Sequence, residues 1–397
     1  MALENVFIPY GGYFSSPFIK WQGAFADDNS VTLAAATAKR WLEGREISVE
    51  SFSSLGLGFT VPQKSSFYGA PWIAALIGNQ GISGPMYAQA CATGARVLAG
   101  SAHEIEAGLS DCILGLTFDR CSNGPHVVYP APNAPGGTAV SENWVMDNFN
   151  KDPYARNAMV ETAENVAKEH GISREEQDAC TLIRNTQYED ALKDDRAFQK
   201  RYMFGVEIGL GKRAKIIEED AGVFPTTAEG LAKLKPVLPE GTVTFGAQTH
   251  PADGNAGMIL TTKDKASEFS TNKDISVQVL SFGQCRVGKG MMPTAPVPAA
   301  KQALAAAGIE IKDVKAIKSH NPFAVNDVFF AKEFGLKIED FNNYGSPLVY
   351  GHPQGPTGMR VIVELIEELA ISGGGYGLFT GCAAGDSAMA VVIKVDA

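Results

Sequence analysis

The chain has 397 residues, of which 45% are hydrophobic and 20% charged, and its formal net charge is -10. The length predicts two or three hydrophobic cores, and the negative charge argues against a non-specific nucleic-acid binder or a membrane-surface protein. No apolar run of about 18 residues predicts a membrane span, and no basic segment before an apolar stretch predicts a signal peptide.

The six cysteines, at positions 91, 112, 121, 180, 285 and 382, include no C-x-x-C pair. Scattered thiols in a chain of this size are typical of a reducing compartment rather than of a disulfide framework or a zinc site. We therefore expect a soluble cytoplasmic protein.

The first 120 residues alternate between strand-like and helix-like stretches. This alternation favours a mostly parallel sheet covered by helices. The expected strands lie at 6–10, 53–60 and 111–118, and the expected helices at 30–42, 70–78 and 92–108.

The segment 121–241 has a different amino-acid composition and pattern. It opens on a loop rich in Pro, Gly and Asn at 123–137, followed by polar helical stretches at 154–170 and after Ser173. A segment this long inside an α/β pattern is better interpreted as an inserted lid or subdomain than as one loop. From Thr242 the apolar alternation resumes and forms a second α/β half, with a strong helix over 297–309.

Two short segments repeat each other. Residues 93–98 read TGARVL and residues 357–362 read TGMRVI. Each follows an extended segment and opens an amphipathic helix, and each helix is followed by a Gly-rich turn and an apolar strand. The equivalent placement indicates two related halves that pack against each other.

Cys91 lies between an extended run and the first of these repeated helices. The free amides and positive end of a helix stabilise a thiolate, so this position predicts a lowered thiol pKa and a nucleophile. Ala90, Ala92 and Gly94 would let an acyl group approach the sulfur. A buried structural cysteine is the alternative interpretation, and the position of Cys91 alone does not separate the two.

His352 lies in a turn, YGHPQGPTG, before the second repeated helix. If the halves are related by pseudo-symmetry, this turn faces the Cys91 turn and supplies the base that activates a thiol. A solvent-exposed loop histidine is the alternative. Cys382, in LFTGCAAG, is then a second thiol whose ordinary pKa of about 8.5 suits proton transfer to and from carbon.

His320 follows a strand-like stretch, and it can donate a hydrogen bond to a thioester oxygen, as can Asn321 beside it. A neutral core histidine is the alternative. The sequence has no Walker-type loop, no G-x-G-x-x-G after a first strand, no G-x-S-x-G and no cluster with metal-ligand spacing. We therefore expect the chemistry to depend on the cysteines and histidines, with no metal or nucleotide cofactor in this chain.

These motifs, in this order, resemble the thiolase family over most of the chain. The resemblance implies an α/β thiolase fold, in which two βαβαβαββ halves form a five-layered core with an inserted loop domain. It implies an N-terminal half at 1–120 completed by 242–270, a loop domain at 121–241 and a C-terminal half at 271–397. The segments that carry it are QACATGARVLAG, the stretch 224–260, VPAAKQALAAAGIEIKDVKAI, SHNPF, YGHPQGPTGMR and GCAAGDSAMAVVI.

The resemblance also implies roles in the cleavage of a 3-oxoacyl-CoA by coenzyme A, or in the reverse Claisen condensation. Cys91 would carry the acyl group, His352 would take its proton and bind the thioester oxygen, and Cys382 would exchange a proton with the α-carbon. The backbone N–H groups of Cys91 and Ala384 would form an oxyanion hole. Thr249 falls where the family often has a Ser near the pantetheine arm of coenzyme A.

Two positions depart from the commonest pattern. His320 occupies the place of the Asn in an Asn-Glu-x-Phe motif, which resembles the His-x-x-Phe subgroup of sterol-carrier-type and archaeal thiolases. Ala384 replaces a usual Gly, but it keeps a backbone N–H. Some members of this subgroup work with a small accessory subunit that has a zinc ribbon and an OB-like fold. Homodimers or tetramers are expected from the family.

The likeness is strongest to thiolases of aromatic catabolism. Aromatic side chains before the nucleophile could line an acyl pocket, although core packing explains them equally well; they are Phe59, Phe67, Tyr68, Trp72 and Tyr87. Two other interpretations stay open. One is a ketoacyl-synthase-like condensing enzyme, which needs no second catalytic cysteine. The other is a non-catalytic thiolase-like subunit or lipid carrier.

Overall fold

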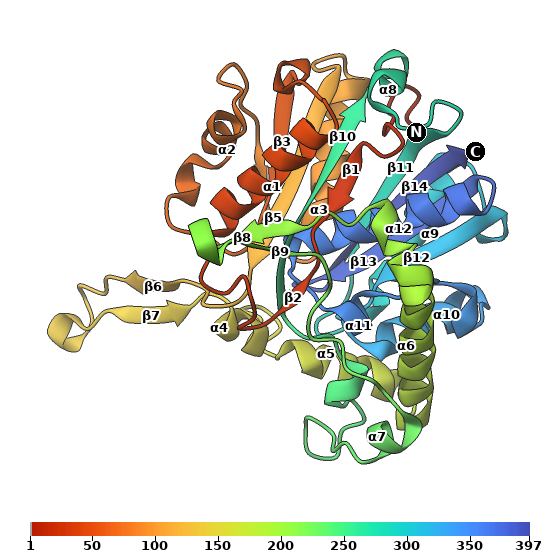
Figure 1. Cartoon of the computed structure of the whole chain (residues 1–397). Helices are drawn as coiled ribbons and strands as arrows, with labels where there is room; N and C mark the ends of the chain where they lie inside the picture. The colour runs from red at the N-terminus through yellow and green to blue at the C-terminus, as the bar shows by residue number, and fades with distance from the viewer. Residues whose placement is uncertain (1) are drawn as a thin grey trace.

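The computed structural model describes residues 2–397, and its first sheet is built from the N-terminal part of the chain together with a strand far along it (Figure 1). The strand order is β1-β10-β5-β3-β4, with β2 beside β10. β5 is antiparallel to β10 and parallel to β3. The strands are β1 (Tyr13–Ser15), β2 (Ile19–Lys20), β3 (Ser54–Gly58), β4 (Met86–Tyr87), β5 (Cys112–Arg120) and β10 (Ala252–Thr261).

The second sheet has the order β11-β14-β13-β12. Counted along the chain, its strands take the same places as β1, β10, β5 and β3 in the first sheet, so the two halves share one topology. The strand that would correspond to β4 is not formed among residues 2–397. The strands are β11 (Ser276–Arg286), β12 (Val314–His320), β13 (Gly375–Ala383) and β14 (Ser387–Asp396).

Helices separate and cover the sheets. α3 (Thr93–Glu106) and α12 (Gly355–Ile371) lie between them, and every residue of α12 from Gly355 to Leu369 is buried, including the charged residues Arg360, Glu364, Glu367 and Glu368. α1 (Ser30–Gly44) and α2 (Gly69–Ile77) cover the first sheet, while α9 (Pro296–Ala307) and α10 (Ala324–Phe334) cover the second. The predicted five-layered α/β fold is confirmed.

The repeated glycines mark the closest approach of the two halves. A Cβ added to Gly94 would lie 2.6 Å from the backbone N of Met359, and one added to Gly358 would lie 3.3 Å from the backbone N of Ala95. The starts of α3 and α12 therefore touch backbone to backbone. This contact places the turns that precede the two helices, and hence Cys91 and His352, on the same side of the crossing.

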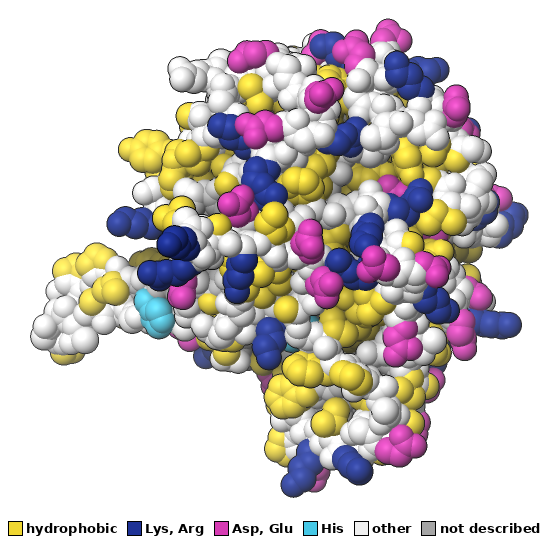
Figure 2. All heavy atoms as spheres, in the orientation of Figure 1, with side chains coloured by type: hydrophobic (Ala, Val, Ile, Leu, Met, Phe, Trp, Pro, Cys, Tyr) yellow, Lys and Arg dark blue, Asp and Glu magenta, His cyan; other side chains and the backbone are white. Residues whose placement is uncertain are grey.

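The segment between β5 and β10 holds a projecting hairpin and a group of helices that packs against the second half (Figure 1). Figure 2 shows hydrophobic side chains along the hairpin, where Val128, Tyr129 and Val140 are exposed. A buried ion pair between Arg184 and Asp327 of α10 joins this segment to the core. The elements are β6 (His126–Tyr129), β7 (Val140–Asn143), α4 (Met146–Asn150), α5 (Met159–Glu169), α6 (Arg174–Arg196), β8 (Val206–Ile208), β9 (Lys215–Ile217) and α7 (Ala228–Ala232).

Two short helices remain, α8 (Lys263–Phe269) and α11 (Pro347–Tyr350). The strand predicted over 6–10 is wrong, because Phe7 forms isolated bridges with Gln278 and Thr261 and no strand is assigned there. Pro9 has no N–H to donate, and its carbonyl instead accepts a turn bond from Gly12. None of the helices described has the length and apolar character needed to cross a bilayer.

Candidate active site

Cys91 lies in the tight turn between β4 and α3. The residue before it, Ala90, has a φ of 44°, a left-handed conformation that a small side chain tolerates. Thr93 fixes this turn, since its hydroxyl accepts the N–H of Gln89 and donates to the carbonyl of Ala90, both at 2.8 Å. The side chain of Cys91 is half-buried.

His352 is held in the turn between α11 and α12. Its backbone N–H donates to the carbonyl of His250 at 2.9 Å, and its Nδ1 shares a hydrogen bond of 2.7 Å with the hydroxyl of Thr357. Its buried Nε2 has no hydrogen-bond partner among the residues described. Thr357 and Thr93 occupy equivalent places in the repeat, but the hydroxyl of Thr93 bonds to the backbone of its turn, whereas the hydroxyl of Thr357 bonds to the ring of His352.

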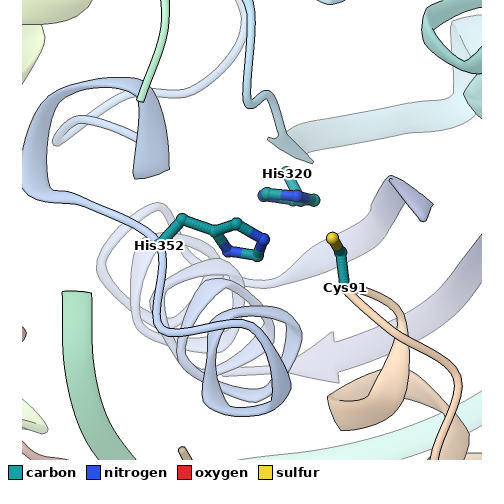
Figure 3. Close-up of side chains that lie close together, drawn as sticks. All are labelled: Cys91, His320 and His352. Carbon is teal, nitrogen blue, oxygen red and sulfur yellow. The ribbon is translucent and has the colours of Figure 1, made fainter. Parts of the chain in front are cut away.

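His320 ends β12 and lies against His352. The two ring centroids are 4.1 Å apart and the ring planes are inclined by 32°. Neither ring nitrogen of His320 finds a partner within residues 2–397. Figure 3 shows the sulfur of Cys91 pointing toward the two rings, and one ligand-type atom from each of the three residues lies within 4.8 Å of the others.

Both histidines are neutral in this setting. Burial lowers the pKa of His320 to about 3. Burial also lowers the pKa of His352 far below its usual range, and the neighbouring His320 lowers it further. A neutral imidazole with a free Nε2 can accept a proton, so His352 has the form that a base for Cys91 requires.

The predicted low pKa of Cys91 is wrong. Burial raises the pKa of this thiol to about 11, although hydrogen bonds from the backbone N–H groups of Ala384 and Cys91 itself lower it. The helix N-terminus is present, but loss of water around the sulfur outweighs the field of its amides. The resting nucleophile is therefore a thiol.

Gln354 contacts the nucleophile directly and was not identified from the sequence. The thiol of Cys91 donates to its Oε1 at 3.1 Å. Its φ of 65° and ψ of -101° lie outside the ordinary regions for a residue with a side chain. The turn is held by Asp119, which accepts the N–H of Gly355 at 2.8 Å. The restraint on the turn before the repeated helix is the signal that could have pointed to Gln354.

Cys382 is buried in β13, and its Sγ accepts a hydrogen bond of 3.3 Å from Nδ2 of Asn326. Burial raises the pKa of the thiol well above its usual value, and the nearby Cys91 raises it further. Asn326 lies on α10 and was also missed, because nothing in the sequence links a helix position to a strand 56 residues away.

The three residues predicted to bind coenzyme A lie in different settings. Ala384 is exposed in the turn after β13 and has no positive φ, so this backbone does not need a glycine. The hydroxyl of Thr249 donates to the carbonyl of Pro347 at 2.5 Å. Asn321 is fully buried, and its amide group bonds to Asp327, Ser346 and the backbone of Leu348.

The fold brings Cys91, His320 and His352 into a group of potential metal ligands that no sequence spacing indicated. Nδ1 of His352 already bonds to Thr357, and the Cys91 thiol already donates to Gln354. A thiol that keeps its proton is not a metal ligand, so this arrangement fits proton transfer better than metal binding.

The aromatic side chains before the nucleophile do not form one group. Phe59 stacks on Phe118 at 5.2 Å and belongs to the core. Phe67 and Tyr68 are 85% and 65% exposed, so they face outward from the start of α2. Core packing thus explains Phe59, while the exposed pair lies on a surface.

Comparisons with known proteins decide the family. The thiolase N-terminal domain matches residues 14–264, and the thiolase C-terminal domain matches residues 273–395. The chain belongs to the thiolase family. As a thiolase it is an acyltransferase, which confirms the predicted enzyme class.

Curated and solved relatives agree with this assignment. The thiolase is 30% identical over 310 residues to the cytosolic acetyl-CoA acetyltransferase of Rattus norvegicus, covering 77% of each chain. It is 27% identical over 381 residues to the beta-ketothiolase BktB of Cupriavidus necator, covering 94% of this chain and 95% of that one. The crystal structure of human mitochondrial 3-ketoacyl-CoA thiolase in complex with CoA superposes with a TM-score of 0.90 at 26% identity, covering 99% of each chain.

Proposed function

We propose that this thiolase cleaves a 3-oxoacyl-CoA with free coenzyme A through an acyl thioester on Cys91. The observation that carries the proposal is the meeting of Cys91, His352 and His320 at the starts of the two central helices, with all three pointing into one site (Figure 3). CoA-dependent thiolase activity follows from the family, and the roles below assign its steps to residues.

In the first step the thiol of Cys91 gives its proton to Nε2 of His352, and the sulfur attacks the 3-oxo carbon. The C2–C3 bond then breaks, its electron pair forms an enolate on the departing acyl-CoA, and the acyl group remains on Cys91. Cys382 gives its proton to the enolate carbon. Burial keeps Cys382 protonated at rest, which suits this direction of the reaction.

In the second step free coenzyme A attacks the acyl thioester. The thiol of coenzyme A gives its proton to the thiolate of Cys382, the new thioester forms, and Cys91 leaves as a thiolate that recovers its proton from His352. Each proton returns to the group that held it at the start, so the cycle needs no other reactant.

Charge that develops on oxygen needs donors in a site with little water. We assign the oxygen of the first intermediate to an N–H of the neutral His320 ring and to the N–H that His352 gains at Nε2 when it takes the Cys91 proton. We assign the oxygen of the acyl-enzyme to the backbone N–H groups of Cys91 and Ala384, because both hydrogen-bond toward the Cys91 sulfur. Thr249 is assigned to the pantetheine arm, and Asn321 to the support of the loop beside it.

We propose an aromatic substrate of degradative metabolism, such as benzoylsuccinyl-CoA, and membership of the His-x-x-Phe subgroup. The support is the resemblance of the sequence and the presence of His320 in the motif. We also propose loop-domain boundaries of 121–241 between halves at 1–120 with 242–270 and at 271–397. A homodimer or tetramer is proposed from the exposed apolar residues of the hairpin and of α2, with a zinc-ribbon accessory subunit as a further partner.

The test is thiolysis of a panel of 3-oxoacyl-CoAs with free coenzyme A, including acetoacetyl-CoA and benzoylsuccinyl-CoA. We expect consumption of at least one panel member and a mass increase at Cys91 that matches its acyl group. Cys91→Ser and His352→Ala are expected to lose activity by at least about 10³-fold, as for removal of a nucleophile or its base. Thiolysis retained by either variant would contradict the role assigned to the residue that it lacks.

A ketoacyl-synthase-like reaction is the second candidate, because a cysteine with two histidines occurs in that family and is present here as Cys91, His320 and His352. Such an enzyme releases CO₂ from a malonyl thioester and needs no second thiol. Incubation with malonyl-CoA separates the two. Release of CO₂ that persists in Cys382→Ala would favour this reaction over thiolysis.

A further inference from the structure

Each of the two thiols in the site is hydrogen-bonded to a side-chain amide group. One amide accepts a hydrogen bond from its thiol, and the other donates a hydrogen bond to its sulfur. Cys91 donates its hydrogen to the carbonyl oxygen of Gln354 at 3.1 Å. Cys382 accepts a hydrogen from the amide nitrogen of Asn326 at 3.3 Å. A thiol that donates is stabilised in its protonated form, whereas a sulfur that accepts is stabilised as a thiolate.

We propose that Gln354 and Asn326 give the two cysteines their separate proton-transfer roles. Gln354 holds Cys91 as a thiol until His352 takes its proton. Asn326 stabilises the thiolate that Cys382 becomes after giving its proton to the enolate. This inference rests on the proposed function, but it concerns two residues that the sequence did not indicate.

The sense of the Cys91–Gln354 bond follows from the other groups at the sulfur. The backbone N–H groups of Ala384 and Cys91 both hydrogen-bond toward it, so its lone pairs already face donors. Its own hydrogen must point at an acceptor, and Oε1 of Gln354 lies at hydrogen-bond distance.

The backbone conformation that holds the Gln354 side chain in place is energetically unfavourable. Its φ of 65° and ψ of -101° are strained for a residue with a Cβ, and such strain persists where the surroundings determine it. The N–H of Gly355 is anchored on the buried carboxylate of Asp119. The residue is 6% exposed, so its side chain has little freedom to leave the sulfur.

The same oxygen can serve after proton transfer. Once the Cys91 proton has moved to Nε2 of His352, Oε1 of Gln354 has lost its first donor and is free to accept another hydrogen bond. Gln354 raises the pKa of His352, although burial lowers that pKa by more. In this proposal one carbonyl oxygen accepts a hydrogen bond from Cys91 before the transfer and from His352 after it.

Asn326 is fixed by the residue that follows it. Asp327 accepts hydrogen bonds from Arg184, Ser319 and Asn321, and this buried network anchors the start of α10. Asn326 is 2% exposed and presents its Nδ2 to Cys382, while its Oδ1 has no hydrogen-bond partner in the described chain. The amide is thus positioned to meet negative charge on the sulfur.

The test compares Gln354→Leu, Gln354→Glu and Asn326→Leu with wild type and with Gln80→Leu, a control at an exposed glutamine. Iodoacetamide alkylation of Cys91, followed by peptide mass spectrometry across pH, reports the thiolate without requiring turnover. We expect Gln354→Leu to alkylate roughly 3- to 10-fold faster at pH 7, the factor for one ordinary hydrogen bond. Gln354→Glu should alkylate more slowly, because a carboxylate opposes the thiolate.

The second readout is exchange of the α-protons of acetyl-CoA in deuterated buffer, measured per acylated enzyme. We expect Asn326→Leu to slow this exchange by about 10-fold or more with unchanged Cys91 alkylation, since a hydrogen bond to a charged group is lost. Gln354→Leu should leave the exchange per acylated site unchanged. The thermal midpoint of each variant is recorded as a folding control.

Equal effects of all substitutions on both readouts, or Gln354→Leu and Gln354→Glu changing alkylation in the same direction, would overturn the inference. Failure of wild type to acylate Cys91 with any acyl-CoA would remove the proposed function instead. The two failures are therefore distinguishable, because alkylation of Cys91 does not depend on an acyl-CoA.

Discussion

The imidazole rings of His320 and His352 lie against each other, with centroids 4.1 Å apart and planes inclined by 32°. Two imidazolium ions this close in a buried site would repel each other strongly, so the pair holds at most one added proton. That proton belongs on His352, whose Nδ1 is braced by Thr357 and whose Nε2 is free. His320 stays neutral, so it can donate a hydrogen bond to the oxygen of the intermediate while His352 gains and loses its proton.

The first prediction concerns stability and pH in His320→Asn. Burial lowers the pKa of His320 to about 3 in the folded protein, below the value of about 6.5 expected when unfolded. Its contribution to stability is therefore present above pH 6.5 and is lost as the pH falls toward 3. Between pH 7 and pH 5 the wild type should lose about 2 kcal/mol through this group. The His320→Asn variant should not lose this part of the unfolding free energy between pH 7 and pH 5.

Urea unfolding at pH 7 and pH 5 measures this difference. His126→Asn is the matched control, because His126 is exposed on the projecting hairpin and should leave the pH dependence unchanged. Equal pH dependence in wild type and His320→Asn would mean that His320 is solvated or protonated in the folded protein.

The second prediction concerns the reactivity of Cys91 in the free enzyme. Burial raises the pKa of its thiol to about 11, so little thiolate exists at neutral pH. The rate of alkylation by iodoacetamide should rise about tenfold per pH unit from pH 7 to pH 9, without a plateau. A plateau below pH 8 would instead indicate a thiolate–imidazolium pair at rest, as the helix N-terminus alone had suggested.

The third prediction tests the crossing of the central helices with Gly94→Ala. The added Cβ would lie 2.6 Å from the backbone N of Met359 and 2.8 Å from the carbonyl O of Gly355. Neither backbone can yield without moving the turn that carries His352. We expect a loss of about 1–3 kcal/mol in unfolding free energy and a larger proportional loss of kcat than of substrate binding.

Gly44→Ala serves as the control for Gly94→Ala, since no atom lies within 4 Å of a Cβ added there. Chemical denaturation and steady-state kinetics report the two effects separately. Wild-type stability in Gly94→Ala would show that the helices can separate slightly, and the close contact would then not be what places Cys91 opposite His352.

The α/β layers and the main site residues could be predicted from the sequence. The layers follow from the local apolar pattern, and the site residues lie beside the repeated helix starts. The apolar alternation predicted β3, β5, α1 and α3 close to their observed bounds. The repeated T-G-x-R-V indicated that two helix starts meet, and the small residues at Gly94 and Gly358 are what make the contact possible.

The missed features depend on contacts between distant segments. The balance between burial and helix amides at Cys91 requires knowing how much water surrounds the sulfur. The partners Gln354 and Asn326 come from a turn and a helix whose polar residues look like ordinary surface residues in the sequence. The strand predicted near Val6 failed for a local reason, since Pro9 removes a donor.

The last prediction concerns Asp119, which lies one residue before the end of β5 and supports the Gln354 turn. Its carboxylate accepts the backbone N–H groups of Thr60, Val61 and Gly355 at 2.7–2.8 Å. In Asp119→Asn one carboxylate oxygen becomes an NH₂ group facing such donors, so at least one hydrogen bond is lost. We expect a destabilisation of about 1–3 kcal/mol and faster alkylation of Cys91, because the turn that presents Gln354 is released.

The pH dependence of the stability of Asp119→Asn gives a second, independent test. Burial raises the pKa of Asp119 to about 7, above the value near 3.8 of an unperturbed carboxyl, and its hydrogen bonds oppose that rise. Its stabilising contribution is then full below pH 3.8 and is lost as the pH rises through 7. The stability gap between wild type and Asp119→Asn should therefore narrow from pH 5 to pH 8. A gap that widens over this range would mean that the N–H donors keep Asp119 ionised in the folded protein.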